Sequence, residues 1–331
     1  MIFETEQANK LIVPDILNGK ATFLKDVLKG LSSSPKKLDS KYFYDATGDS
    51  LFQQIMACEE YYVTRCEAEI FKTTPTEIAR SLTQGYDEFD LIELGAGDAS
   101  KTIYLLQELV GMSLNFRYVP VDISGTIIDY LESELPQKVP RLVVEGLNGE
   151  YLEMLQKANT HSPRKKVVLF LGSNIGNMDT AQALSFLSEI RSNLTLGDRM
   201  LIGFDLKKDP FTILAAYNDT AGYTKAFNLN LLDRINQELG ANFEVCQFEH
   251  YPTYDPITGA CKSYLVSKTQ QQVHLADQII RFSKGEVISM ELSQKYDQME
   301  IKSMAANSGF VATKLFTDHR NWFVDSIWEC V

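Results

Sequence analysis

The stretch LIELGAGDASKT, residues 91–102, decides the fold, because it joins a strand pattern to a helix pattern through a glycine-rich turn. Apolar residues lead up to Gly95, and the helical spacing of SKTIYLLQELV follows over residues 100–110. Gly95 and Gly97 allow the backbone to turn sharply and to approach a ligand closely at the start of a helix. The stretch therefore predicts a nucleotide-type loop at the carboxyl end of a strand.

Strand and helix patterns alternate regularly over residues 66–205. The apolar runs FRYVPVDIS (116–124), PRLVVEG (140–146) and KVVLFLGS (166–173) are typical of strands. The amphipathic stretch DTAQALSFLSEIRSNL (179–194) is typical of a helix. Apolar strands that alternate with helices indicate a parallel sheet covered on both faces. We therefore expect an α/β fold whose ligand binds at the carboxyl ends of the strands.

The character of the sequence changes after Asp209. Two helix patterns are interrupted near NDTAG (218–222), and β-type segments follow over residues 243–296. A last helix pattern over residues 297–309 precedes FVATKLFTD and WFVDSIWECV, which we predict to be an antiparallel pair of strands. We therefore expect an α+β part added to the α/β unit, and we expect the residues before about 66 to join that added part.

Composition and charge narrow the classes of partner. The 331 residues are too many for one small core, and the net charge of −12 argues against a nucleic-acid surface and an anionic membrane. No apolar run has membrane-spanning length, and the first ten residues lack a basic-then-apolar signal. The five cysteines form no CxxC pair, and no two of the four histidines have ligand spacing. We expect a reduced, cytoplasmic protein without a metal site, and the net charge says little about small-molecule substrates.

The glycine loop differs from the common nucleotide-binding patterns. Ser100 stands where a dinucleotide fingerprint has its third glycine, and no GxxxxGK[ST] loop is present. Asp122 ends the next strand, where an acid suits the two ribose hydroxyls of an adenosine. Gly146 and Leu147 are placed to flank an adenine ring. These features favour S-adenosylmethionine over NAD, because no pyrophosphate has to be held. The alternative is an α/β protein whose glycines and acid are ordinary turn residues.

Lys101 lies at the start of the predicted helix and has two interpretations. Its ammonium can pair with the carboxylate of S-adenosylmethionine, as a charge-assisted hydrogen bond. Alternatively, it is a solvated surface lysine.

Seven strings, spread in order over most of the chain, carry a resemblance to a known family. They are YFYDATGDSLFQQI (42–55), EEYYVTRCEAEI (59–70), ELGAGDASKT (93–102), YVPVDIS (118–124), FLGSNIGN (170–177), the stretch from DLKKDPF to GANF (205–243) and SMELSQKY (289–296). Together they resemble the histidine-specific, S-adenosylmethionine-dependent methyltransferases of the ergothioneine pathway.

The resemblance implies an enzyme that methylates the α-amino group of histidine three times, giving a betaine (hercynine) and S-adenosylhomocysteine. It implies a Rossmann-like class I methyltransferase domain over residues 66–205 and an α+β substrate-binding domain over residues 1–65 and 206–331. The C-terminal strands are placed to complete the methyltransferase sheet. The family also implies a monomer.

Residue roles follow from the matching motifs. For the cofactor, the resemblance implies the loop residues Gly95 and Gly97, the carboxylate partner Lys101, the ribose-binding Asp122 and, less closely matched, the adenine-loop residues Gly146 and Leu147. For the amino acid, it implies Tyr61, Asn177 and Tyr217, with Tyr44 lining the amine site. Glu291 and Ser293 match the pair that holds the imidazole ring.

The chemistry of these residue types suits methyl transfer, which is an in-line displacement that depends on positioning. Asn177 and Tyr217 can bind the substrate carboxylate without placing a cation near the sulfonium. Tyr44 can accept a hydrogen bond from the amine, and its ordinary pKa of about 10 makes it a positioner or relay rather than a general base. Tyr44 and Tyr217 are therefore the expected catalytic residues.

One position departs from the family pattern. Ser263, in ACKSYLVSK, stands where the family has a methionine that packs on the substrate side chain. A smaller, more polar wall keeps histidine as the expected substrate but opens the alternative of another aromatic or polar amino acid, such as tryptophan. A second alternative is a protein that binds adenosylmethionine without turnover.

Overall fold

The structure is a computed structural model that describes residues 19–331, and its contacts divide the chain into two compact units. Unit 1 is formed by Met1–Tyr61, of which residues 19–61 are described, with Asp209–Asp255 and Cys261–Leu292. Unit 2 is formed by Tyr62–Lys208, Pro256–Ala260 and Ser293–Val331.

Two expectations fall partly outside the described residues. The first is that residues 1–10 lack a targeting signal. The second is that the substrate-binding domain begins within residues 1–65. Among the helices of residues 19–331, none combines the length and the apolar character that crossing a membrane requires.

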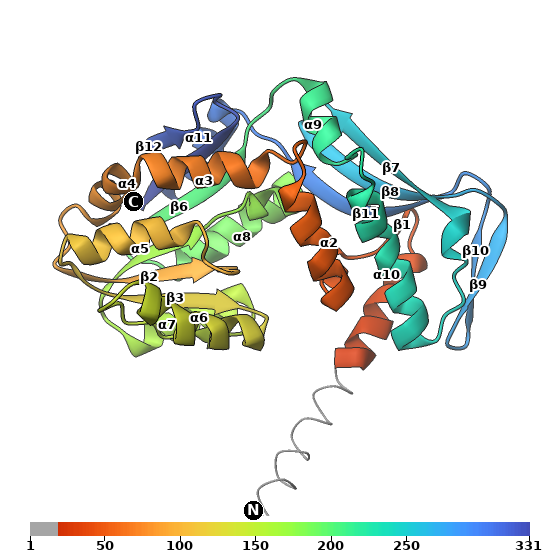
Figure 1. Ribbon diagram of the computed structural model, residues 1–331, viewed down its shortest axis with the longest axis horizontal. Helices are drawn as coiled ribbons and strands as arrows, with labels where there is room; N and C mark the ends of the chain where they lie inside the picture. The colour runs from red at the N-terminus through yellow and green to blue at the C-terminus, as the bar shows by residue number, and fades with distance from the viewer. Residues whose placement is uncertain (1–18) are drawn as a thin grey trace, which may run out of the picture. The chain divides into compact units, whose positions relative to one another are not determined.

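Unit 2 is built on a seven-stranded sheet of order β12-β13-β6-β5-β2-β3-β4 (Figure 1). The strands are β2 (Glu88–Leu94), β3 (Asn115–Asp122), β4 (Leu147–Asn148), β5 (Lys165–Phe170), β6 (Arg199–Asp205), β12 (Phe310–Thr317) and β13 (Phe323–Cys330). Strands β4, β3, β2, β5 and β6 run parallel. Strand β13 pairs antiparallel with both β6 and β12. The parallel sheet and the final antiparallel pair confirm the sequence prediction.

Helices cover both faces of this sheet, as predicted. One face packs against α7 (Tyr151–His161), α8 (Thr180–Ser192) and α11 (Gln298–Asn307), whose Leu155, Leu187 and Ile301 lie in one buried cluster with Ile202 of β6. On the opposite face, α3 (Val63–Thr73) contacts β12 and β13, α4 (Pro75–Thr83) contacts β6, and α5 (Thr102–Gly111) packs beside α3 and α4. Helix α6 (Gly125–Lys138) lies beside β3 and β4. Burial on both faces explains why the strands are almost wholly apolar.

The strand predicted over residues 140–146 is much shorter in the structure. Only Val144 bridges to Tyr118, and β4 begins at Leu147. Arg141 has a φ of 76°, a left-handed conformation that cannot continue a strand. The segment lies at the edge of the sheet, so its backbone has one neighbouring strand instead of two.

Unit 1 combines helices with a smaller sheet of order β1-β11-β8-β7. Its strands are β1 (Lys36–Lys37), β7 (Phe248–Asp255), β8 (Ala260–Ser267) and β11 (Val287–Gln294), and β9 (Gln271–Leu275) with β10 (Gln278–Phe282) forms a hairpin. Its helices are residues 19–31, α2 (Ala46–Ala57), α9 (Pro210–Ala216) and α10 (Tyr223–Leu239). The helix break predicted near residues 218–222 falls between α9 and α10.

The core of unit 1 lies between its helices and one face of its sheet. Val27, Leu231 and Ile235 from the helices are buried in one cluster with Leu265 and Met290 from β8 and β11. The helical spacing of ATFLKDVLKGL (21–31) therefore predicted the core-facing side of the first described helix.

Candidate active site

The glycine loop follows β2 and is tied to the end of β3. Gly95 and Gly97 have φ values of 74° and 52°, which glycine adopts without strain. The Gly95 and Ala96 N–H groups donate to the Val121 carbonyl at 2.8 and 3.3 Å. A side chain at Gly95 would place its Cβ 2.7 Å from the Tyr151 hydroxyl. Conformation and space therefore both require glycine at position 95.

The structure brings Asp122 to this loop. Asp122 is the last residue of β3, and its Oδ2 accepts a hydrogen bond from the Gly97 N–H at 3.3 Å. Its Oδ1 accepts from the Ser124 N–H at 2.9 Å, and Ser124 caps α6. The predicted ribose-binding acid and the second loop glycine are therefore direct neighbours at the carboxyl end of the sheet.

The third predicted cofactor segment, Gly146 and Leu147, lies beside Asp122. Leu147 pairs with Val121 in the sheet, and the Asn148 side-chain amide donates to the Asp122 carbonyl at 3.0 Å. The Gly146 N–H donates to Glu132 Oε1 at 2.7 Å. Glu132 therefore fixes this loop through the backbone of Gly146.

Lys101 forms an ion pair with Glu67 of α3, whose side chain is fully buried. Burial disfavours the Lys101 ammonium, but the Glu67 carboxylate more than offsets this and raises the pKa of Lys101. The other Glu67 oxygen accepts the Gly172 N–H at 2.7 Å. Gly203 of β6 makes room for that carboxylate, because a Cβ there would collide with it. Lys101 is therefore not a solvated surface lysine.

A second acid, Asp325 of β13, is fully buried near this ion pair. It lies opposite Gly203 in the sheet, and neither of its oxygens has a hydrogen-bond partner within residues 19–331. Burial, and then the nearby Glu67 carboxylate, raise the pKa of Asp325 well above its ordinary value. The sequence prediction missed Glu67 and Asp325. The apolar residues around each of them already predict a helix or strand that packs against the hydrophobic core, so neither acid stands out.

Glu93, next to the glycine loop, is also buried. It accepts hydrogen bonds from the Tyr118 hydroxyl at 2.5 Å and the Thr102 hydroxyl at 2.7 Å. Burial raises the pKa of the Glu93 carboxyl to about 7, although both hydrogen bonds oppose the rise. Glu93 anchors the start of α5 through Thr102, and its place in ELGAG was a signal that the sequence prediction did not use.

Asn177 ends the short 3-10 helix η2 (Asn174–Asn177), which follows β5. Its side chain is exposed, and α8 is capped by Asp179, which forms a capping box with Gln182. Asn177 is therefore not the cap of α8. Ser173, at the start of η2, accepts the Asp205 N–H through its hydroxyl at 3.2 Å, which ties this turn to the end of β6.

Asp205 is the centre of a buried polar group in unit 2. Its carboxylate accepts from the Tyr62 hydroxyl at 2.9 and 3.1 Å, from Lys295 at 2.6 Å and from Lys208. Burial opposes its charge, but the two ammonium groups more than offset this and lower the pKa of Asp205. Lys295 also donates to the Ser293 hydroxyl at 2.8 Å. We name these five residues the Asp205 group.

Within unit 1, the structure brings the three predicted tyrosines together. The Tyr44 and Tyr61 rings lie 5.7 and 6.3 Å from the ring of Phe52 in α2, and the Tyr61 ring lies 6.3 Å from that of Tyr217. Tyr217 caps the end of α9 and is buried, whereas Tyr44 is 47% exposed. Phe52, which the sequence prediction missed, is therefore the common neighbour of Tyr44 and Tyr61, and Tyr61 links them to Tyr217.

Ser263 is buried in β8, and its hydroxyl lies 3.2 Å from His250 Nε2 on β7. Burial lowers the pKa of His250 to about 4, so this imidazole is neutral at ordinary pH. Its Nδ1 has no hydrogen-bond partner among the described residues, and neither have Thr224 Oγ1 and Asn228 Oδ1 of α10. Glu291 is half-buried in β11, two residues before Ser293.

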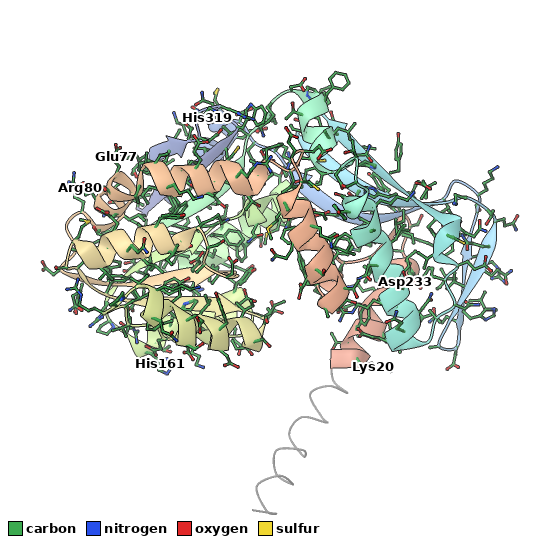
Figure 2. The ribbon with its side chains drawn as sticks, in the orientation of Figure 1. Lys20, Glu77, Arg80, His161, Asp233 and His319 are labelled. Atoms are coloured by element: carbon green, nitrogen blue, oxygen red, sulfur yellow. The ribbon has the colours of Figure 1, made fainter. Side chains whose placement is uncertain are left out.

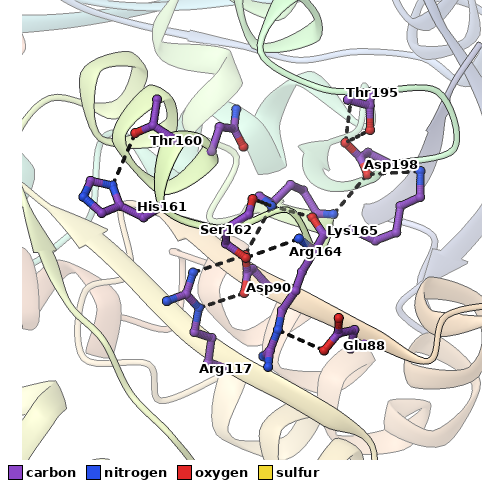
Figure 3. Close-up of polar contacts among 12 residues, drawn as sticks. Glu88, Asp90, Arg117, Thr160, His161, Ser162, Arg164, Lys165, Thr195 and Asp198 are labelled. Carbon is purple, nitrogen blue, oxygen red and sulfur yellow. Dashed lines mark hydrogen bonds and ion pairs between the residues drawn. The ribbon is translucent and has the colours of Figure 1, made fainter.

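The amino ends of the parallel strands in the unit 2 sheet carry charged residues that do not belong to the predicted site (Figure 3). Asp90 of β2 is buried and pairs with Arg117 at 2.8 Å and Lys166 at 3.2 Å. Hollows of about 400 and 450 Å³ lie at this end, the first lined by Arg80 (labelled in Figure 2) and the second by Glu88. None of the predicted site residues lines either hollow. These ion pairs therefore lie at the amino ends of the strands, away from the predicted site.

A small polar cluster outside the predicted site resembles a metal site in residue type. Glu69, Asp318 and His319 lie close together, with His319 labelled in Figure 2. His319 Nδ1 lies 2.7 Å from Glu69, and Asp318 accepts the backbone N–H groups of Trp322 and Phe323 at 2.7 and 2.8 Å. These contacts belong to the turn that precedes β13, and they explain why the three residues lie close together.

The sheet order, the glycine loop after β2, the acid at the end of β3 and the reversed strand β13 define a Rossmann-like class I methyltransferase. The chain belongs to the family described as "Histidine-specific methyltransferase, SAM-dependent", which matches residues 23–330. S-adenosylmethionine is accordingly its cofactor, and methyl transfer is its reaction class.

Two relatives that match about nine-tenths of this chain support the family assignment. The histidine N-alpha-methyltransferase of Mycolicibacterium smegmatis is 36% identical over 296 residues, which is 89% of this chain and 90% of that protein. The protein of the same name from Mycobacterium tuberculosis is 32% identical over 92% of this chain and 94% of its own. The magnesium protoporphyrin IX methyltransferase of Synechocystis PCC 6803 aligns over 88% of this chain and 98% of its own, with 12% identity and a TM-score of 0.45.

Proposed function

We propose that the protein transfers methyl groups from S-adenosylmethionine to the α-amino group of L-histidine, three times in succession, to give the betaine. The observation that carries the proposal is the similarity over about nine-tenths of the chain to proteins named histidine N-alpha-methyltransferase. The net charge of −12 argues against a nucleic-acid partner, and we infer a monomer.

The residues at the carboxyl end of the unit 2 sheet fit S-adenosylmethionine. An added Cβ at Gly97 would meet no atom within 4 Å, so the loop is open on that side, and Asp122 lies beside Gly97 with an acceptor for ribose hydroxyls. Lys101 has three ammonium protons, so it can bond both to Glu67 and to the cofactor's carboxylate. When bound, the cofactor supplies an electrophilic methyl group on a sulfonium.

We assign the remaining predicted residues to the substrate. Asn177 and Tyr217 bind its carboxylate with neutral donors, and Tyr61 packs beside Tyr217. Tyr44 accepts a hydrogen bond from the amine and passes its proton to water, which its 47% exposure permits. Because a neutral amine must be aimed at the methyl group, most of the catalysis in this proposal is positioning.

The test is incubation of the purified protein with S-adenosylmethionine and histidine, followed by mass spectrometry. We expect products that carry one, two and three added methyl groups, with the trimethylated product accumulating. Unmodified histidine after prolonged incubation, with another amino acid methylated in the same assay, would overturn the choice of substrate. Binding of the cofactor by calorimetry without any turnover would instead favour a catalytically silent protein.

A second candidate substrate has one specific observation in its favour. Ser263 forms a buried polar pair with His250, where the resemblance predicts an apolar methionine. A polar wall suits another aromatic or polar amino acid, such as tryptophan, whose N–H can find an acceptor there. A screen of the common amino acids with cofactor present separates this candidate from histidine by their relative kcat/KM values.

A further inference from the structure

We propose that Asn174 binds the amino-acid end of S-adenosylmethionine, where its side-chain amide shares the cofactor's carboxylate with Lys101. Asn174 lies in the string FLGSNIGN (170–177), in which the resemblance assigned only Asn177. The inference extends the proposed function, because it rests on the assignment of Lys101 to that carboxylate. It makes Asn174 a further cofactor-binding residue.

The backbone of Asn174 is held at the carboxyl end of the unit 2 sheet. Strands β2 and β5 are parallel neighbours, and each is followed by a glycine with a positive φ, 74° at Gly95 and 75° at Gly172. Asn174 comes two residues after Gly172 and begins η2. The turn between them is tied to β6, because the Ser173 hydroxyl accepts the Asp205 N–H at 3.2 Å. The sheet therefore sets the position of the Asn174 backbone.

The Asn174 side chain lies near both glycines and beside Lys101. Its amide nitrogen lies 3.7 Å from the position that a Cβ at Gly172 would take, and the Lys101 Nζ lies 3.8 Å from the same position. Apart from Gly172 and its chain neighbours, no atom of the described residues lies nearer to that position. The amide nitrogen also lies 3.4 Å from the corresponding position at Gly95. A ligand atom beside Gly172 would therefore touch both nitrogens.

The two nitrogens that meet beside Gly172 have protons available for a ligand. The Asn174 side chain is partly exposed and makes no hydrogen bond with another of the residues 19–331. Lys101 has three ammonium protons, and its bond to Glu67 uses one of them. Two neighbouring donors with no acceptor between them suit an anion, and the cofactor's carboxylate offers an oxygen to each.

An amide also suits the positive charges of the cofactor. A second lysine at position 174 would repel the cofactor's ammonium and sulfonium, whereas a neutral amide does not. The amide nitrogen donates to the carboxylate, and the amide oxygen remains as an acceptor for the ammonium. Asn174 is therefore complementary to both charged groups of the amino-acid end.

Two substitutions at Asn174 separate this role from a structural one. Asn174→Asp keeps the shape of the side chain but places a negative charge beside the cofactor's carboxylate. Asn174→Leu keeps the approximate size and removes both polar groups. Neither breaks a side-chain hydrogen bond among the described residues. Asn115→Leu is the matched control, because Asn115 is an exposed asparagine at the amino end of β3 in the same unit.

The experiment measures the affinity of the full chain for three ligands by calorimetry. They are S-adenosylhomocysteine, its decarboxylated analogue, and 5′-methylthioadenosine, which lacks the amino-acid end. For S-adenosylhomocysteine we expect a loss of about tenfold in Asn174→Leu and about thirtyfold in Asn174→Asp. Asn174→Asp should bind the decarboxylated analogue at least as tightly as the wild type does. Affinity for methylthioadenosine should not change in either variant, and Asn115→Leu should bind all three ligands normally.

An equal loss for all three ligands would overturn the proposal, because Asn174 would then support the loop and not the carboxylate. Unchanged affinity for S-adenosylhomocysteine in both variants would also overturn it. Lys101→Met tests the assignment on which the proposal rests, and it must weaken S-adenosylhomocysteine more than methylthioadenosine. A wild type that shows the expected binding pattern but methylates no histidine contradicts the proposed substrate and leaves the role of Asn174 intact.

Discussion

The Lys101 ammonium and the Glu67 carboxylate form an ion pair beneath the glycine loop, and the glutamate side chain is fully buried. The Gly172 N–H binds the second Glu67 oxygen at 2.7 Å, so the carboxylate is held from two sides. The residue that we assign to the cofactor's carboxylate is therefore already oriented by the protein. Orientation of this kind lowers the cost of binding, because little side-chain freedom remains to be lost.

Lys101→Met is expected to reduce stability as well as cofactor affinity. It leaves Glu67 as a buried charge without its cation, which costs about 3 kcal/mol in the free energy of unfolding. Urea unfolding measures this loss. The double variant Lys101→Met/Glu67→Gln should recover much of the stability but not the affinity for S-adenosylhomocysteine. Full affinity in the double variant would show that Lys101 does not bind the cofactor.

Gly95→Ala is expected to weaken cofactor binding through the shape of the loop. The new Cβ would lie 2.7 Å from the Tyr151 hydroxyl, at a φ of 74°. Gly85→Ala is the matched control, because Gly85 also has a positive φ, 83°, but no atom within 4 Å of the added Cβ. Both variants should lose about 1 kcal/mol of stability from the strained backbone. Calorimetry with S-adenosylhomocysteine should show at least a tenfold loss for Gly95→Ala alone, and equal affinities would contradict the prediction.

Asp325→Asn is expected to stabilise the protein in a pH-dependent way. Burial raises the pKa of Asp325, so the folded protein keeps a proton that the unfolded chain releases above about pH 3.9. The stability of the wild type therefore falls as the pH rises through that range toward the folded pKa, whereas asparagine carries no such cost. The gain in the free energy of unfolding should be largest at about pH 8 and should vanish near pH 4. A gain that does not change with pH would refute a raised pKa.

Glu291→Ala is expected to raise KM for histidine strongly, because the variant loses a charge-assisted hydrogen bond to the ring. A loss of about 2 kcal/mol corresponds to roughly thirtyfold in kcat/KM. The preference should shift toward apolar aromatic amino acids. Glu249→Ala is a suitable control, since Glu249 is a half-exposed acid of unit 1 that pairs with Lys225. Unchanged preference in Glu291→Ala would remove this residue from the site.

The sequence predicted the parts of the fold that depend on local pattern. The alternation over residues 66–205 gave the parallel sheet, and the glycines after β2 gave the cofactor loop next to Asp122. The strand over residues 140–146 was too long, because nothing in its apolar pattern reveals the left-handed Arg141.

Pairings between distant residues could not be predicted in this way. Lys101 and Glu67 are 34 residues apart, and buried ion pairs leave no periodic signal in either segment. The same holds for Lys295, whose partner Asp205 lies at the end of another element. The tyrosines around Phe52 were found only through the family resemblance, because tyrosine is common in this chain, with 15 copies.

The contacts of the Asp205 group limit which substitutions this enzyme can tolerate. One residue fixes the turn at Ser173 through its backbone, and Tyr62 and Lys295 through its carboxylate. A substitution at Asp205 would remove the carboxylate that binds Tyr62, Lys208 and Lys295 together, so few such variants would keep an active protein. Ser263, by contrast, is joined to His250 by a single hydrogen bond of 3.2 Å. In the proposed function Ser263 lines the substrate pocket, so natural selection and protein engineering should find new substrates by varying Ser263 while Asp205 remains unchanged.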